Sequence, residues 1–366
     1  MKVIKTKRNY GIDLLRILSM LFVVLLHSYG QGGILANVTP GTMQYKCSWM
    51  VEIIAFCAVN IFALISGYVM YDKKDIKLSS YINLWFQVVF YGLIVTLIFD
   101  IADTTVATRS DYIRSILPVT KNLYWYFTAY TGLFFLIPFL NKAITNLSNT
   151  ALKKYFIIII AVFSVYDTIT NKFNLSLGYS VMWLLLVYIL GAILKKCEIA
   201  KKVKTYKLVL MLIGLYLITF LYKMYGFEFN IIEYSITKSI FINYTSPTIL
   251  GVAVLYVLIF SRLKFCSIFE KIIKFAAPSA FTIYLLNNHA LIWQYVISGM
   301  FSTTATRSVI VILVYTFGFS IAFVVISILI DRVRIQLFKV LKIQTLSIKI
   351  QNIIYYLINK TTLLLK

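Results

Sequence analysis

Long apolar runs dominate this sequence, and they constrain its fold more than any other feature. About ten runs are long enough to cross roughly 30 Å of hydrocarbon as helices. They cover residues 12–29, 49–70, 81–99, 123–141, 155–170, 179–195, 208–224, 240–260, 275–298 and 309–331. Hydrophobic residues make up 60% of the chain and charged residues only 13%, a balance that a soluble domain cannot bury. The sequence therefore predicts an all-α, polytopic protein of the cell membrane with about ten transmembrane helices.

The basic residues predict how these helices are oriented. With the N-terminus inside, 27 of the 36 lysines and arginines fall in cytoplasmic segments and eight fall in outer loops. This bias follows the positive-inside rule and predicts that both termini are cytoplasmic. After the last run, residues 332–366 combine basic residues with apolar ones at helical spacing. We expect a membrane domain over residues 1–331 and, over 332–366, a basic amphipathic tail bound to anionic membrane lipids.

Charge and cysteine content exclude several other classes of protein. The formal net charge of +23 is divided among short clusters between apolar runs, a pattern that argues against nucleic-acid binding. The four cysteines lack metal-ligand spacing, so we expect neither a metal site nor a disulfide framework. No small-residue cleavage site follows the basic N-terminus. The first apolar run is therefore predicted to be a retained span rather than a signal peptide.

Three ionisable residues lie on one face of the first predicted span: Asp13, Arg16 and His27. At about 100° per residue, Arg16 and His27 lie only about 20° apart around the axis and roughly 16 Å apart along it. Each has a simpler explanation, since His27 could be neutral and satisfied by a neighbouring helix, Arg16 could extend to the interface, and Asp13 could neutralise Arg16. Ionisable groups within a bilayer rarely face lipid, so their alignment favours a pathway or a reaction centre.

Further polar residues occur in later spans. Asn287, Asn288 and His289 are adjacent in the ninth span, at a depth close to that of His27. Such side chains need internal hydrogen-bond partners and should face the bundle interior, either in a site or in a helix–helix contact. Ser66 is more typical of close helix packing, and Trp125 of an interfacial aromatic belt.

Five segments together resemble a known family. They are the Asp13, Leu15-Arg16 and His27 pattern, Phe62 to Tyr68, Leu123-Tyr-Trp125 with the run to Pro138, Trp183 to Gly191, and Ala280 to Leu285. In this order they resemble the acyltransferase-3 family of integral-membrane O-acyltransferases, whose members acylate bacterial surface glycans. The resemblance covers residues 10–295. Within the family, the sequence looks like the branch whose members are found with capsule and exopolysaccharide gene clusters.

The sequence departs from the family pattern at two places. In many relatives a histidine directly follows the run that ends here at Leu286, whereas Asn287 and Asn288 intervene before His289. The helix entered at Lys77 often carries an arginine pair, and here the stretch from Ser80 onward has none. These departures bear on any role for His289 and on any arginine contact with the acyl donor in the third span.

The resemblance implies transfer of an acyl group, most simply acetyl from cytoplasmic acetyl-CoA, to a hydroxyl of a cell-surface polysaccharide or its lipid-linked precursor. That reaction needs a cation for the donor's phosphates, a route through hydrocarbon and a base for the acceptor hydroxyl. Arg16 is expected to hold an anionic part of coenzyme A, with Asp13 orienting it. His27 is expected to deprotonate the hydroxyl or to carry the acyl group as a covalent relay.

The acceptor is expected to contact Asn288, His289, Trp125 and Ser66. Acetyl and succinyl donors differ by only a few atoms in a pocket, so the sequence does not separate them. Two other functions fit the composition: a transporter or polymerase of lipid-linked glycans, and a non-catalytic family relative in polysaccharide assembly. A transporter should show repeat symmetry and a polymerase a large outer loop, and neither is evident in the sequence.

Overall fold

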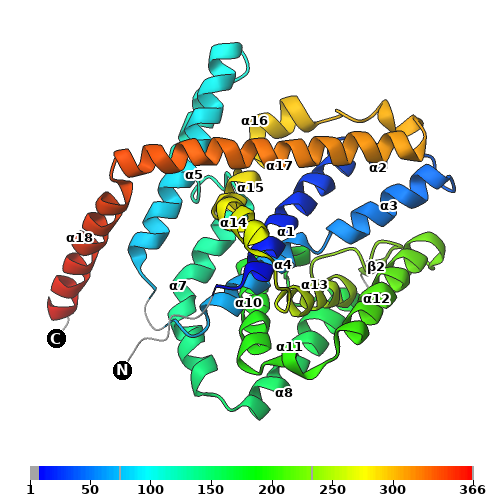
Figure 1. Ribbon diagram of the computed structural model, residues 1–366, viewed down its shortest axis with the longest axis horizontal. Helices are drawn as coiled ribbons and strands as arrows, with labels where there is room; N and C mark the ends of the chain where they lie inside the picture. The colour runs from blue at the N-terminus through cyan, green and yellow to red at the C-terminus, as the bar shows by residue number, and fades with distance from the viewer. Residues whose placement is uncertain (1–7, 74–75, 232–233, 365–366) are drawn as a thin grey trace.

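The protein is largely helical in the computed structural model, which describes residues 8–73, 76–231 and 234–364 (Figure 1). The α-helices are α1 Tyr10–Tyr29, α2 Ile34–Asn37, α3 Met43–Ala55, α4 Ala58–Met70, α5 Leu78–Ala102, α6 Arg109–Ile116, α7 Trp125–Asn146, α8 Asn149–Ile159, α9 Asp167–Thr170, α10 Val181–Lys196, α11 Ile199–Lys202, α12 Thr205–Tyr225, α13 Pro247–Phe260, α14 Ser267–Ala276, α15 Ala280–Asn287, α16 Ala290–Ile292, α17 Val309–Val340 and α18 Ile343–Leu364. Short 3₁₀ turns cover Ser176–Gly178, Ala277–Ser279 and Thr304–Thr306, and π-helical turns cover Ile160–Tyr166 and Trp293–Ile297. A small antiparallel hairpin of β1 Phe229–Ile231 and β2 Tyr234–Ile236 interrupts the otherwise helical chain between α12 and α13.

Within the described residues, six helical segments are long and apolar enough to cross a membrane. They are Tyr10–Asn37, Met43–Met70, Leu78–Ala102, Trp125–Asn146, Thr205–Tyr225 and Val309–Val340. The other four expected spans fall on shorter or interrupted helices. The fifth span is α8 continued by a π-helical turn and α9, the sixth is α10, the eighth is α13, and the ninth is the series from α14 to α16. The chain is a multi-pass, helical membrane protein, while the count of ten spans and the side of the termini stay predictions.

The ninth expected span is not one helix. Pro278 lies in the 3₁₀ turn between α14 and α15, where its missing N–H would break an α-helical ladder. Helix α15 ends at Asn287, and His289 adopts extended backbone angles before α16 begins. The sequence predicted a continuous helix over residues 275–298 because apolar residues run through it. Instead, the side chain of His289 caps the start of α16, and the chain turns at this point beside α1.

Helices α4 and α10 pack closely through two glycines. A methyl group at Gly67 would lie 1.9 Å from the carbonyl oxygen of Tyr188, and one at Gly191 would lie 2.1 Å from that of Leu64. Any larger residue would push the backbones apart, as expected for small residues at membrane helix contacts. This contact explains the Ser66-Gly67 segment as a packing element.

Helix α1 occupies the centre of the bundle (Figure 1). It contacts α3, α4, α13, α14, α15 and α17, and buried residues are spread around its circumference. Such all-round burial is typical of a core helix, so its polar side chains face protein rather than lipid. The long helix α17 runs along one side and continues past residue 331 to Val340, after which α18 turns away and packs on α5.

Candidate functional site

The polar face of α1 begins with a charged network near its first turn. Asn9 caps the helix by accepting a hydrogen bond from the Ile12 N–H, which fixes where the helix starts. Asp13 is only 7% exposed and pairs with two arginines. Its carboxylate receives Arg8 Nε at 2.5 Å and Arg16 Nη1 at 3.2 Å. Asp13 therefore holds Arg16 in place while it is itself neutralised from both sides.

The other end of the same helix carries His27 in a different setting. Its Nδ1 is hydrogen-bonded to Oδ1 of Asn287, at the end of α15. The edge of its ring meets Trp293, with ring centroids 4.4 Å apart. No carboxylate contacts this histidine among the described residues, so its partners are an amide and an aromatic ring.

His27 lines a cavity of about 440 Å³, which we call the His27 cavity. Its wall is aromatic and includes Trp125, Tyr179, Tyr244, Tyr284 and Trp293. Trp125 anchors one side, with ring centroids 4.6 Å from Tyr179 and 6.4 Å from Tyr244. A pocket with aromatic walls and a few polar groups is typical of a small-molecule site.

An apolar constriction separates this cavity from the Arg16 level. Met20 and Val23 of α1, with Phe62, Tyr126 and Tyr284 among their neighbours, enclose a space of only about 10 Å³. The constriction shares Val23 and Tyr284 with the His27 cavity, so the two spaces are adjacent.

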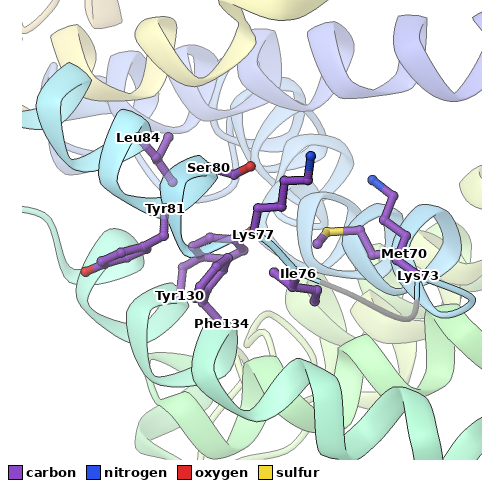
Figure 2. A pocket seen from close by; sticks show the side chains of 9 residues that line it. All are labelled: Met70, Lys73, Ile76, Lys77, Ser80, Tyr81, Leu84, Tyr130 and Phe134. Carbon is purple, nitrogen blue, oxygen red and sulfur yellow. The ribbon is translucent and has the colours of Figure 1, made fainter. Parts of the chain in front are cut away.

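A second hollow lies beyond the constriction, between α4, α5 and α7 (Figure 2). This lysine pocket, of about 310 Å³, is lined by Lys73 and Lys77 and by the rings of Tyr81, Tyr130 and Phe134. Figure 2 shows both lysine ammonium groups on one side and the three rings on the other. Tyr130 also lies within electrostatic range of the Arg16 guanidinium, which connects this pocket to the polar face of α1.

A larger basic cleft opens near the start of α1. Its volume is about 820 Å³, and Arg8, Lys195, Arg262 and Lys264 are among the basic residues that line it. Three aromatic rings also line it, and two of them face cations: Arg8 lies 5.7 Å from the ring centroid of Tyr10, and Lys195 lies 4.9 Å from that of Tyr68. Arg8 belongs to this cleft and to the Asp13 network, so the two features adjoin.

The remaining predicted residues lie at different places. Trp125 and Asn288 line the His27 cavity. His289 is buried outside its lining, where Nε2 contacts the Gly92 carbonyl at 3.3 Å and Nδ1 accepts from the Leu291 N–H at 3.3 Å. Ser66 donates to the carbonyl oxygen of Phe62 at 3.1 Å. The structure thus brings Trp125 and Asn288 to His27, whereas Ser66 contacts the backbone of its own helix and His289 contacts the backbone of Gly92 in α5 and of Leu291.

Sequence reasoning overlooked Asn287 and the pair of Lys73 and Lys77. Asn287 stood in a run of three polar residues, and nothing in the sequence decides which of the three would face His27. The lysines were counted only as evidence for orientation. Their signal was their position on both sides of the loop before α5, close to the stretch where relatives carry arginines.

A protein-family model described as an acyltransferase domain matches residues 9–332 of this chain. The matched range contains Asp13 and Arg16, the lysine pocket, the constriction and the His27 cavity. No curated protein and no solved structure matches the chain.

Proposed function

The chain belongs to the acyltransferase-3 family, and from this premise we propose that it transfers an acyl group, acetyl in the first instance, from cytoplasmic acyl-CoA to a hydroxyl outside. The acceptor is a cell-surface polysaccharide or its lipid-linked precursor. The observation that carries the proposal is a row of three spaces that α7 lines in turn: the lysine pocket at Tyr130, the constriction at Tyr126 and the His27 cavity at Trp125.

Two helices give this row its order. Along α1, Arg16 is followed by Met20 and Val23 of the constriction and then by His27. Along α7 the order is reversed, because Trp125 lines the His27 cavity, Tyr126 the constriction and Tyr130 the lysine pocket. Matching sequences on two helices support a continuous route rather than unrelated hollows.

The lysine pocket and Arg16 form the donor end of the proposed route. Lys73 and Lys77 supply positive charge for phosphate groups, and the rings of Tyr81 and Tyr130 offer faces for an adenine base. Arg16 lies nearer the constriction and binds an anionic or carbonyl part of the donor closer to the thioester. Lysines at this entry replace the arginine pair that relatives carry nearby.

The His27 cavity forms the acceptor end. Apolar faces of a sugar ring pack on Trp125 and Tyr244, and the acceptor hydroxyl donates to His27. His27 takes the hydroxyl proton as the oxygen attacks the thioester carbonyl carbon. The new C–O bond forms, the C–S bond breaks, and the leaving sulfur recovers the proton from His27. The products are the ester and free coenzyme A.

The constriction must open during turnover. A space of about 10 Å³ has room for no more than about one water molecule, so no acyl chain fits in it as it stands. The side chains of Phe62 and Tyr126 therefore have to move when the donor arm enters. A closed constriction in the resting protein also limits leakage of water and ions.

The experiment that tests this function compares wild type with His27→Gln and Arg16→Ala in the native host. Ester-linked acyl groups on surface polysaccharide are quantified by NMR, and protein levels are measured by immunoblot. We expect loss of the ester signal with normal polymer export. Unchanged acylation in both variants would contradict the proposal, and normal acylation with lost export would instead favour a transporter.

A further inference from the structure

Asn287 makes the direct hydrogen bond to His27, and this contact determines which imidazole nitrogen can react. We infer that Asn287 is a positioning residue that accepts a hydrogen bond from Nδ1–H of His27 and so keeps Nε2 unprotonated for the acceptor hydroxyl. The inference rests on the proposed function, because it assigns His27 the role of base.

The contact between His27 and Asn287 joins a ring nitrogen to an amide oxygen. Nδ1 of His27 faces Oδ1 of Asn287, an atom that can only accept a hydrogen bond. In a neutral imidazole one nitrogen is a donor and the other an acceptor. A donating Nδ1 therefore leaves the lone pair on Nε2. That is the atom a base needs when it takes a proton from a substrate hydroxyl.

The packing of α15 holds Asn287 in place. Its side chain is fully buried, and α15 is tied at its first turn to two other helices. Thr282 of α15 donates to Asp331 of α17 at 2.6 Å and accepts from Gln87 of α5 at 2.9 Å. A helix of eight residues held in this way has little freedom to move its last residue away from α1.

The ring of His27 is also restrained from a second side. The edge contact with Trp293 limits rotation of the imidazole about its χ2 torsion. Together, the amide and the indole define both the tautomer and the ring orientation. This is the arrangement of a base and a third orienting group that hydrolases and transferases use on many folds.

The partner is an amide rather than a carboxylate, and this has a chemical consequence. An amide oxygen orients the imidazole without placing a negative charge beside it, and the proton taken from the hydroxyl stays on His27 until the sulfur leaves. Asn287 is the last residue of α15, directly after Leu286, and its side-chain oxygen faces Nδ1 of His27.

Two nearly isosteric substitutions separate this role from simple packing. Asn287→Asp keeps an oxygen acceptor at the position of Oδ1 but removes the amide donor. Asn287→Leu keeps the number and branching of the side-chain heavy atoms and removes the acceptor. If the acceptor oxygen is what matters, the aspartate variant keeps activity within about tenfold of wild type, whereas the leucine variant loses roughly 10²-fold or more in kcat. The KM for acetyl-CoA should change little in both, because the donor binds at the other end of the route.

The assay uses the full chain in lipid nanodiscs, with radiolabelled acetyl-CoA as donor and de-esterified surface polysaccharide of the native host as acceptor. The same substitutions at Asn146, an exposed residue at the end of α7, provide matched controls. Size-exclusion profiles report whether each variant folds. Equal losses in the aspartate and leucine variants, or full activity of the leucine variant, would overturn the inference.

A spectroscopic measurement makes the inference independent of turnover. The chain has only two histidines, so ¹⁵N-histidine labelling gives two imidazole spin systems, and His27→Gln assigns the one from His27. We expect a protonated Nδ1 and an unprotonated Nε2 in wild type and in Asn287→Asp, and mixed tautomers in Asn287→Leu. The opposite tautomer in wild type would overturn the inference. Absence of acetyl transfer with the expected tautomer would instead refute the proposed function alone.

Discussion

The two ends of α1 hold their polar groups in contrasting ways. At the Arg16 end, charges neutralise one another, since Asp13 is bracketed by Arg8 and Arg16 and the arginine side chains are 40% and 27% exposed. At the other end, His27 has a neutral amide and aromatic rings as neighbours. The difference matches what each end is proposed to bind, a polyanionic donor on one side and an uncharged hydroxyl on the other. If one helix carries these two proposed sites, variants at each end should change different kinetic constants.

The largest expected effect is at the His27 end. His27→Gln keeps a polar side chain of similar size but removes the base, so acetyl transfer should fall by roughly 10³-fold. The KM for acetyl-CoA should stay within about twofold, because the donor is bound through the other end of α1. Steady-state kinetics in nanodiscs measure both constants. A raised KM for acetyl-CoA with normal kcat would show that His27 contributes to donor binding. The two ends of α1 would then not differ in function.

The Arg16 end should show the opposite pattern. Arg16→Ala is expected to raise the KM for acetyl-CoA by about tenfold or more, since a charge-assisted contact to the donor is lost. Arg16→Lys should recover only part of this loss, because lysine lacks the planar fork of a guanidinium. Equal changes in the KM values of donor and acceptor would contradict the assignment of Arg16 to the donor.

Arg16 and His27 also show which parts of the candidate site can be predicted from the sequence. Helical periodicity alone placed Arg16 and His27 on one face, and the structure keeps both on a single continuous helix. It could not pair His27 with Asn287, because 260 positions separate them and the contact depends on where α15 ends. Likewise, the break at His289 arises from local capping, whereas an apolar run predicts only an uninterrupted span.

The lysine pocket and the basic cleft permit a matched test of the donor end. Replacing Lys73 and Lys77 together by alanine should raise the KM for acetyl-CoA about fivefold and weaken its dependence on salt. The same double substitution at Lys195 and Lys264 of the basic cleft should leave the KM unchanged. If the cleft variant carries the effect instead, the nucleotide part of the donor binds there and the lysine pocket has another role.

The smallest effect is expected at the aromatic wall. Trp125→Leu keeps an apolar surface but removes the flat indole face, so the KM for de-esterified polysaccharide should rise about threefold. Acetyl-CoA binding should not change, because Trp125 lies beyond the constriction from the lysine pocket. A change in the KM for acetyl-CoA alone would show that the aromatic wall of the His27 cavity contacts the donor.

Sidedness of the reaction tests the central claim most directly. The full chain is reconstituted in vesicles of uniform orientation, with acetyl-CoA confined to one side and de-esterified polysaccharide to the other. The account predicts ester formation when acetyl-CoA faces the lysine pocket and the polysaccharide faces the His27 cavity, and none when the two are exchanged. Transfer only when donor and acceptor share one side would contradict a route along α1 through the membrane.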